Sequence, residues 1–301
     1  MKSILLHPLA GSAYLLLGSL PVIHAADLEA PHPIVAVRGH YAKLGALNPA
    51  PSANDLPLDV KRFISKPASI EKVKNRAPEF LRVPLEQFNL PACPANSSLQ
   101  TRAEIDYLLR LQSQRTEEEG KRALYYADWG YSTTAKAGDP DYARSRENIF
   151  YVGRSIGTWF NAHSLPLTAD LIGRMWRDAS FHLWSLKFKY ARIRPVVIDP
   201  RIKNLQETDW AAFPSGHASY AHILAYLYSE LAPEFSDIFL TDARNIAHSR
   251  EVIGVHYPSD SEAGRVFGRQ FVNALLQDDK FKAEFAKVRQ EWERVRAISP
   301  D

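Results

Sequence analysis

The chain of 301 residues is poor in cysteine and shows no large excess of charge of either sign. Cys93 is its only cysteine, so an intrachain disulfide is impossible. The 37 Lys and Arg residues are nearly balanced by 34 Asp and Glu residues, which gives a formal net charge of +3. A balance this even does not favour a nucleic acid polymer as partner. Apolar residues make up 46% of the chain, which is ample for a packed core.

Long uninterrupted apolar runs are also missing. A membrane-spanning helix needs about 18 or more consecutive apolar residues, and no later stretch approaches that length. The N-terminus is different, because Lys2 precedes an apolar segment over 13–23 that small residues follow. This pattern predicts a secretory signal peptide over residues 1–25 rather than a membrane anchor, since Pro8 and Pro21 interrupt the segment. We therefore expect a periplasmic or secreted protein that is not integral to the membrane after cleavage.

The remaining chain divides by composition into two parts. Residues 26–95 contain ten of the 20 prolines and little periodicity, so they predict an irregular N-terminal segment that wraps around the rest. A disordered leader is the alternative, because proline-rich composition does not separate the two. Residues 96–301 are expected to form one helical domain. The sequence leaves a homo-oligomer open.

Apolar residues in this second part recur at three- and four-residue steps, as on one face of a helix. Alternating strand patterns are scarce, and the fold class predicted is therefore all-α, a single helical bundle. The expected helices begin near Thr101 with Glu104 in a capping box, near Thr168, after Pro214, near Asp237, and at a second capping box of Ser259 and Glu262.

A first group of basic residues closes the second of these expected helices. Lys187 and Arg194 are seven positions apart, or about two helical turns, and Pro195 follows directly. A compact ammonium and a planar guanidinium at one end of a helix can reach the same phosphate.

Two further groups lie at helix ends. Pro214-Ser215-Gly216-His217 opens the third helix, where backbone N–H groups and a hydroxyl can meet an anion and glycine permits close approach. Farther along, Arg250 precedes His256, and Asp260 follows that histidine by four positions. A histidine with a nearby carboxylate suits an oriented nucleophile or base. All three groups together predict one anion site.

In this order and spacing, the three motifs resemble the three-part signature of the type 2 phosphatidic acid phosphatase superfamily, whose haloperoxidase-type helical bundle is then the expected fold. Within it the chain most resembles the soluble bacterial class A non-specific acid phosphatases over roughly residues 90–285. The likeness includes the text Tyr190-x-Arg192-Ile193-Arg194-Pro195. The chain departs from those enzymes at Ala212, Phe213 and Ala218, which leaves the substrate range open.

The resemblance implies an acid phosphatase that hydrolyses small phosphate monoesters, with phosphate transfer to alcohols left open, and that uses no metal or other cofactor. His256 would become a phosphohistidine, Asp260 would orient it, and His217 would serve as general acid and then base. The groups that would hold the phosphate oxygens are Lys187, Arg194, Ser215, Gly216 and Arg250. Vanadate, which copies the geometry of phosphoryl transfer, should inhibit such an enzyme.

The proton balance of the site is open at this stage. Because His217 must begin protonated, we expect activity to peak on the acidic side of neutrality. Asp260 raises the pKa of His256 and the basic residues lower it, so the sequence does not give the sign of the net shift.

Several residues near the motifs have simpler interpretations. Lys189 and Arg192 are expected to be solvated charges or ion-pair partners. Surface or core roles are the default for the histidines outside the motifs, His163, His182, His222 and His248. The tryptophans at 129, 159, 176 and 184 are expected in the core, although one aromatic at the mouth of the site could stack on a substrate.

Three rival functions remain. A vanadium-dependent haloperoxidase resembles the same superfamily, but such chains are usually far longer. A lipid phosphatase would carry these motifs at a membrane face, and the chain lacks multiple apolar spans. A phosphate-binding protein without activity would need neither histidine nor Asp260.

Overall fold

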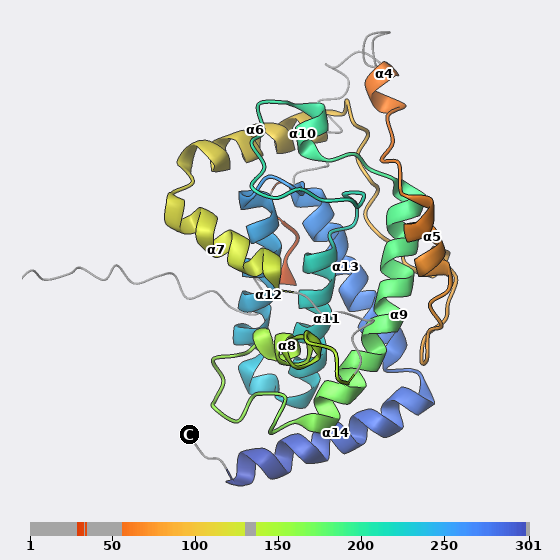
Figure 1. Cartoon of the computed structure of the whole chain (residues 1–301), viewed down its shortest axis with the longest axis vertical. Coiled ribbons are helices and arrows are strands. Elements are labelled where there is room, and N and C mark those ends of the chain that lie inside the picture. Colours follow the sequence, from red (N-terminus) through yellow and green to blue (C-terminus); the bar gives the residue numbers. More distant parts are fainter. Residues whose placement is uncertain (1–28, 33, 35–55, 130–136, 299–301) are drawn as a thin grey trace, which may run out of the picture.

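The computed structural model describes residues 29–32, 34, 56–129 and 137–298, and these form a bundle of helices (Figure 1). The expected signal peptide lies outside the described residues. In the described part there is no strand, so the predicted all-α class is confirmed. The α-helices are α4 (Leu56–Asp59), α5 (Pro67–Lys74), α6 (Leu99–Gln114), α7 (Glu117–Asp128), α8 (Tyr142–Asn148), α9 (Pro166–Tyr190), α10 (Pro195–Ile198), α11 (Gly216–Leu231), α12 (Ser236–Val252), α13 (Pro258–Leu275) and α14 (Asp279–Ile298).

Helix α11 lies at the centre of the bundle and packs mainly against α12 and α13 (Figure 1). Its sequence is apolar on most sides, and side chains such as Ile223, Leu224 and Leu227 are fully buried. A helix that is apolar all round has to be enclosed by others. Helix α7 packs on α12, and α9 lies beside α14. This arrangement places the ends of α9, α11, α12 and α13 near one another.

Two glycines of α13 allow its close approach to α11. A Cβ atom added at Gly264 would lie 2.9 Å from the carbonyl oxygen of Ser215 and 3.0 Å from Ala218 Cβ. One turn later, a Cβ at Gly268 would lie 3.2 Å from atoms of Ser219 and His222. The backbones of the two helices are therefore in contact where the third motif meets the second.

The helix starts differ from those predicted at two places. Helix α6 begins at Leu99 with Ser98 as its N-cap, so the expected capping box of Thr101 and Glu104 is wrong. Helix α13 begins at Pro258, and its first turn is held by the carboxylate of Asp260, which accepts the backbone N–H of Tyr257. The expected box of Ser259 and Glu262 is therefore also wrong. In both cases another residue with a hydroxyl group, Ser98 or Tyr257, lies a few positions before the predicted N-cap and is the N-cap in the structure.

The described part of the N-terminal segment contains helices as well as irregular chain. Helix α5 packs along α9, and the backbone that follows is fixed by a buried carboxylate. Asp178 of α9 accepts the N–H groups of Glu79, Phe80 and Leu81 at 2.7–2.8 Å. The segment is thus tied to α9 over the stretch that leads to α6.

Among the described residues, no helix combines the length and apolar character that a bilayer span requires.

Candidate active site

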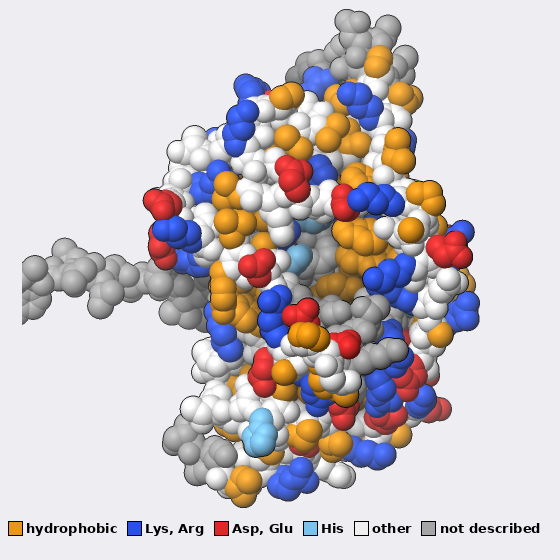
Figure 2. All heavy atoms as spheres, viewed as in Figure 1, with side chains coloured by type: hydrophobic (Ala, Val, Ile, Leu, Met, Phe, Trp, Pro, Cys, Tyr) orange, Lys and Arg blue, Asp and Glu red, His pale blue; other side chains and the backbone are white. Residues whose placement is uncertain are grey.

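The C-terminal end of α9, the connection to α11, and the ends of α11, α12 and α13 surround one cavity of about 320 Å³. On this side of the molecule Figure 2 shows a hollow in which histidine surface is visible, with a hydrophobic patch beside it. Six of the eight site residues predicted from the sequence line this cavity: Lys187, Arg194, Gly216, His217, Arg250 and His256. The other two, Ser215 and Asp260, are fully buried behind the wall.

His256 lies in the turn between α12 and α13, as the motif spacing predicted, and both of its ring nitrogens have a partner. Nδ1 faces the carboxylate Oδ2 of Asp260 at 3.0 Å, and Nε2 lies 3.0 Å from Nη1 of Arg194. Because a guanidinium only donates, Nε2 is the acceptor and the ring proton is on Nδ1. The lone pair of Nε2 is therefore the acceptor for Arg194, and both residues line the cavity.

The net shift of the His256 pKa, which the sequence left open, has a sign in the structure. Burial and the charge of Arg194 lower the pKa of His256 well below its ordinary value, and the opposing effect of Asp260 is smaller. The imidazole is consequently neutral in mildly acidic solution, as a nucleophile must be.

Asp260 is held on both carboxylate oxygens. Oδ2 accepts from His256 and from the N–H of Tyr257, while Oδ1 accepts from Arg192 at 2.7 Å. Burial raises the pKa of Asp260, but Arg192 and His256 together outweigh that effect and hold it below its ordinary value. Asp260 is therefore ionised and fixes the tautomer of His256.

His217 lies in the first turn of α11, on the cavity wall. Its Nε2 donates to the carbonyl oxygen of Ala127 in α7 at 3.1 Å, so Nδ1 is the nitrogen that gains a proton when the ring becomes charged. Burial and the charge of Arg250 lower the pKa of His217 well below its ordinary value, while the carbonyl acts in the opposite direction. A negative charge bound between these cations would raise the pKa of His217 again.

Lys187 and Arg194 are buried cations that backbone carbonyls hold in place. Lys187 Nζ donates to the carbonyl oxygens of Ala211, Ala212 and Pro214 at 2.6–3.3 Å. Arg194 donates to the carbonyls of Trp210, Val255 and Ala211. Burial lowers the pKa of Arg194 to about 10 and that of Lys187 well below its usual range. Both charges are poorly compensated, which favours an anion in the cavity.

Arg250 at the end of α12 has buried donors that could bind an anion. Its Nη2 donates to Gln206, whereas the buried Nε and Nη1 have no hydrogen-bond partner among the described residues. Burial and the nearby Arg194 lower the pKa of Arg250 to about 9. Buried donors without a partner are costly unless a ligand accepts from them. A phosphate oxygen in this cavity would do so.

The Pro214–His217 motif contributes the N-terminus of α11. Ser215 is the N-cap, and its Oγ accepts the N–H of Ala218 at 3.4 Å. The backbone N–H of Ser215 donates to the carbonyl of Asp260, which joins the second and third motifs directly. Gly216 lines the cavity at the positive end of the helix, where a phosphate group is favoured.

The outer wall of the cavity is aromatic and acidic. Trp184 and Trp210 stack with ring centroids 4.9 Å apart and planes 6° apart, and both line the cavity. The tryptophans at 129, 159 and 176 are buried in the core, as predicted, whereas Trp184, which was also expected in the core, lines the cavity. Glu207 and Asp209 lie on the exposed connection beside Trp210.

Two buried residues behind the cavity were not among the site residues predicted from the sequence. The sequence left Arg192 as a solvated charge or an ion-pair partner, and the structure shows the second: it is 2% exposed and forms ion pairs with Asp260 and Glu104. Glu104, which the sequence suggested as a capping residue of α6, is fully buried and faces the start of α13. The only sequence signal was the position of Arg192 inside the first motif.

Possible metal ligands were considered in the same way. Over the described ranges, no group of three or more His, Cys, Asp or Glu side chains is arranged to hold a metal ion.

Comparison with known proteins agrees with this arrangement. The sequence model of the PAP2 superfamily matches residues 178–282, the stretch that carries all three motifs. A non-specific acid phosphatase of Salmonella typhi is 26% identical over 212 residues, which cover 68% of this chain and 79% of the relative. One from Providencia stuartii is 28% identical over 200 residues, covering 64% and 78%. The chain is thus similar to the PAP2 superfamily over residues 178–282 and to non-specific acid phosphatases over a longer stretch.

A solved structure supports the fold. The crystal structure of a bacterial vanadium-dependent iodoperoxidase superposes with a TM-score of 0.55 at 19% identity. The match covers 79% of this chain but only 64% of the iodoperoxidase. At this identity the likeness shows a shared helical architecture and nothing about activity.

Proposed function

We propose that this protein is an acid phosphatase that hydrolyses small phosphate monoesters through a phosphohistidine at His256, without a metal ion. The observation that carries the proposal is the state of His256. Its Nδ1–H is bonded to the buried Asp260 and its Nε2 lone pair faces a cavity whose other walls carry Lys187, Arg194 and Arg250. The names of the acid phosphatase relatives support the same activity.

In the first step, the phosphate group enters the cavity and accepts hydrogen bonds from Arg194. The Nη1 donor that faces His256 Nε2 in the free enzyme then turns to the phosphate. The lone pair of His256 Nε2 then forms a bond to phosphorus as the bond from phosphorus to the ester oxygen breaks. The departing alkoxide takes the proton from Nδ1 of His217 and leaves as an alcohol. Asp260 stabilises the positive charge that develops on the ring of His256.

In the second step, water replaces the alcohol. The now neutral His217 accepts a proton from water as the water oxygen bonds to phosphorus and the bond to Nε2 breaks. Inorganic phosphate leaves, and both histidines return to their first state. Ester and water are consumed, and alcohol and phosphate are formed.

Three buried cations supply the charge that a metal ion provides in other phosphatases. Charge in the transition state lies on the equatorial oxygens of the phosphoryl group. The partnerless N–H groups of Arg250, the guanidinium of Arg194 and the N-terminus of α11 at Gly216 converge on one cavity, where they are already in place before the reaction.

Two histidine variants test these roles. His256→Ala should remove turnover and all phosphate attached to the protein. His217→Ala should turn over slowly, yet still be phosphorylated by 4-nitrophenyl phosphate, because a good leaving group needs no acid. Acid-labile phosphate on the protein is the measurement. If it persists in His256→Ala, or never appears in His217→Ala, the two roles are wrongly assigned.

Inhibitors test the metal-free arrangement. Vanadate should compete with substrate, because its trigonal bipyramidal adduct places oxygens where the cations are aimed. Activity should be unchanged in EDTA. Loss of activity in chelator and rescue by a divalent ion would contradict the proposal.

The rival oxidation is tested in the same preparation. Iodide or bromide oxidation with vanadate and hydrogen peroxide would indicate a haloperoxidase. We expect phosphomonoester hydrolysis and no halide oxidation, in keeping with the acid phosphatase names of the relatives.

The proposed cellular location of the enzyme rests on the N-terminal sequence. The pattern of residues 1–25 favours export and cleavage, and thus a periplasmic or secreted enzyme. N-terminal sequencing of protein recovered from periplasmic and culture fractions tests this. Recovery of uncleaved chain from the cytoplasm alone would contradict it.

A further inference from the structure

Behind His256 lies a row of buried charged groups that the proposed reaction steps do not use. Arg192, just after the end of α9, lies between the carboxylates of Asp260 in α13 and Glu104 in α6. Its side chain is 1% exposed and both carboxylate side chains are fully buried. Three helices far apart in sequence therefore meet at one guanidinium.

The guanidinium divides its donors between the two carboxylates. Nη1 donates to Asp260 Oδ1 at 2.7 Å, and Nη2 donates to Glu104 Oε2 at 3.1 Å. The face of the guanidinium lies 3.8 Å from the ring centre of Tyr257, the residue between His256 and α13. Its planar fork is thus fixed from several sides, which a flexible ammonium could not reproduce.

Asp260 depends on this contact for its orientation. One oxygen serves His256 and the N–H of Tyr257, and the other is occupied by Arg192. Without Arg192, the second oxygen would be a buried acceptor that lacks its charged partner. The carboxylate would then be free to rotate away from the line of the His256 ring.

Glu104 fixes the opposite side of the row. Its Oε1 accepts the backbone N–H of Ser259 at 2.8 Å, and its Oε2 accepts the Ser259 hydroxyl at 2.9 Å. Ser259 is in the first turn of α13, one residue before Asp260. Glu104 therefore positions both Arg192 and the backbone that carries Asp260.

Arg192 also reaches the cation side of the cavity through its backbone. Its carbonyl accepts the N–H of Ala212, and Ala212 is one of the residues whose carbonyls hold Lys187. One residue thus connects the support of the nucleophile with the support of a phosphate-binding cation.

We propose that Arg192 and Glu104 are positioning residues for the reaction: Arg192 keeps Asp260 ionised and aligned with Nδ1 of His256, and Glu104 holds Arg192 and Ser259 in place. The proposal rests on the phosphohistidine mechanism given above. Arg192 and Glu104 touch neither substrate nor reacting atoms, and they act through Asp260 and Ser259.

The charged groups around Asp260 determine how its protonation responds to Arg192. His256 and Tyr257 face it from the turn, and Arg192 faces it from the end of α9. Glu104 contributes from α6, and Cys93 from the N-terminal segment. Lys187 and Arg194 act from across the cavity wall. Burial raises the pKa of Asp260, and Arg192 is the strongest influence in the opposite direction.

Substitution of Arg192 by Gln and by Lys separates charge from geometry. In Arg192→Gln, kcat should decrease about 100-fold, as for other misplaced catalytic groups, with little change in KM. The acidic limb of the kcat–pH profile of this variant, where kcat falls as the pH is lowered, should move to higher pH by about 1–3 units. The reason is that Asp260 loses the cation that favours its ionised form. Arg192→Lys should keep the limb near its original pH while kcat still decreases.

Glu104→Gln gives the opposite sign for pH. When this negative charge is removed, Asp260 is the only carboxylate that pairs with Arg192. The acidic limb of the kcat–pH profile should therefore stay in place or move to lower pH. The variant should still lower kcat, because the start of α13 loses a charged acceptor for two hydrogen bonds. A limb that moves upward in Glu104→Gln contradicts the proposed roles.

A destabilised control separates positioning from folding. Glu291 in α14 is 1% exposed and accepts the N–H groups of Leu167 and Thr168, at the far end of α9 from the cavity. Glu291→Gln should lower the melting temperature without moving the acidic limb. If Arg192→Gln changes only as this control does, the proposal is overturned. If Arg192→Gln does not fold, Arg192→Lys and Glu104→Gln decide the question.

A second measurement does not depend on activity. The ¹⁵N resonances of the His256 ring report its tautomer, and we expect protonation at Nδ1 in the wild type and in Glu291→Gln. In Arg192→Gln the ring should show a mixture of tautomers. An inactive wild type with the expected Nδ1 tautomer contradicts the phosphatase proposal and retains the positioning role. An active wild type whose tautomer is unchanged in Arg192→Gln contradicts the positioning role alone.

Discussion

At the scale of single residues, the stacked pair of Trp184 and Trp210 sits between the phosphate end of the cavity and solvent. Trp184 precedes Lys187 by one helical turn on α9, and the carbonyl of Trp210 accepts from Nε of Arg194. The pair is therefore anchored to two of the cations that we propose to hold phosphate. A flat leaving group attached to that phosphate would lie against these rings, where an aromatic contact adds about 1 kcal/mol.

This arrangement predicts a selective effect of Trp184→Ala. KM for 4-nitrophenyl phosphate should rise about fivefold to tenfold, because that leaving group loses its aromatic contact. KM for glycerol 2-phosphate should change by less than about twofold. Steady-state kinetics with both esters provide the test. An equal rise for both would show that Trp184 holds the phosphate end of the cavity in place and does not contact the leaving group.

The side chains that surround the cavity could be predicted from the sequence because the residues of each motif are close together in the chain. His256 and Asp260 lie within one turn, and Lys187 and Arg194 flank one helix end, so spacing alone brings each pair together. Glu104 could not be found this way, since its partner Arg192 is 88 positions away and lies just after the end of α9. The sign of the His256 pKa was equally hidden, because it depends on burial and on where Arg194 points.

At the scale of elements, the active site depends on how closely α13 approaches the first turn of α11. That turn carries Ser215, Gly216 and His217, and the carbonyl of Ser215 lies where a side chain at position 264 would have to go. The N–H of Ser215 is in turn bonded to Asp260. A change in the spacing of these two helices would therefore move the acid and the nucleophile relative to each other.

Two alanine substitutions on α13 compare this contact with its neighbour. Gly264→Ala forces a backbone atom of the site to shift, and it should lower stability by about 1–3 kcal/mol and kcat at least tenfold. Gly268→Ala meets its nearest atoms at 3.2 Å, one turn farther from the site, and should affect stability more than kcat. Thermal unfolding and kcat of both variants are the measurements. Equal losses of kcat would mean that the position of the contact along α13 is unimportant.

Some helices could be predicted from the sequence and others could not. The predicted helices near Thr168 and after Pro214 correspond to α9 and α11, because long apolar periodicity and flanking prolines mark them. Helices α7 and α14 were not predicted. Both are rich in charged residues and bury a narrow face, so their apolar signal is weaker.

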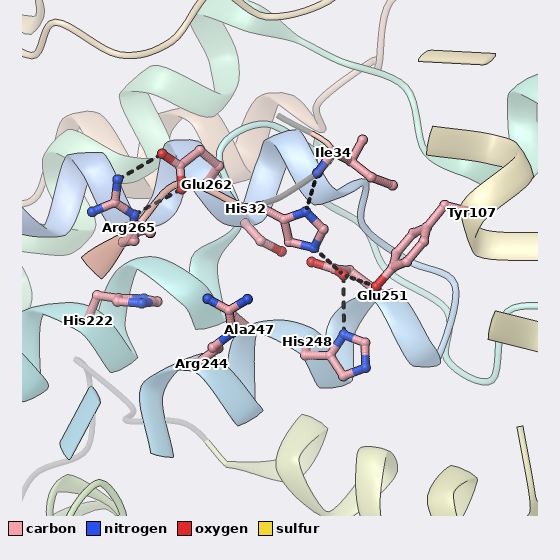
Figure 3. A pocket seen from close by; sticks show the side chains of 12 residues that line it. His32, Ile34, Tyr107, His222, Arg244, Ala247, His248, Glu251, Glu262 and Arg265 are labelled. Carbon is pink, nitrogen blue, oxygen red and sulfur yellow. Dashed lines mark hydrogen bonds and ion pairs between the residues drawn. The ribbon is translucent and has the colours of Figure 1, made fainter. Parts of the chain in front are cut away.

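At the scale of the whole molecule, a second cluster of titratable groups lies close to the active site. Figure 3 shows His32, His248 and Tyr107 pointing toward Glu251, which follows Arg250 on α12. Glu251 is 1% exposed, and its Oε2 lies 3.2–3.4 Å from all three groups. Burial raises the pKa of Glu251, but the two histidines outweigh it and lower the pKa to about 2. The hydrogen bond to Glu251 raises the pKa of His248.

The signs of these shifts define a pH window for stability. Glu251 stabilises the fold at pH values above its pKa in the unfolded chain, near 4.5, and this stabilisation is lost as the pH falls toward its folded pKa of about 2. His248 stabilises the fold at pH values below its pKa in the unfolded chain, near 6.5. This stabilisation is lost as the pH rises through its higher pKa in the folded protein. The cluster therefore stabilises the fold most between about pH 4.5 and 6.5, the range in which an acid phosphatase works.

Glu251→Gln should thus lower the melting temperature by about 5 °C at pH 5.5 and by clearly less at pH 8. Glu262→Gln is the matched control. Glu262 and Glu251 line one cavity, which is separate from the active-site cavity. Glu262 pairs with Arg265, whose charge does not change in this range, so the loss in Glu262→Gln should be the same at both pH values. A pH-independent loss in Glu251→Gln would show that the charge on His248 adds nothing.

The last prediction concerns how catalysis as a whole responds to pH. Without substrate, burial and Arg250 hold the pKa of His217 well below its ordinary value, so the ring takes up a proton less readily than a free imidazole. A bound phosphate dianion offsets these cations and raises that pKa. The profile of kcat/KM follows the free enzyme and that of kcat follows the complex. The alkaline limb of kcat should therefore lie at higher pH than that of kcat/KM.

An alkyl phosphate is the substrate to use, because its poor leaving group requires the proton from His217. Ionisation of the substrate itself, near pH ~6, also enters kcat/KM. His217→Asn measured with 4-nitrophenyl phosphate isolates that part, since the variant has no acid to titrate. The limb that remains in the variant belongs to the substrate, and the difference from the wild type belongs to His217. Coincident alkaline limbs for kcat and kcat/KM in the wild type would mean that bound phosphate does not restore the proton on His217, and another donor would then have to protonate the alkoxide.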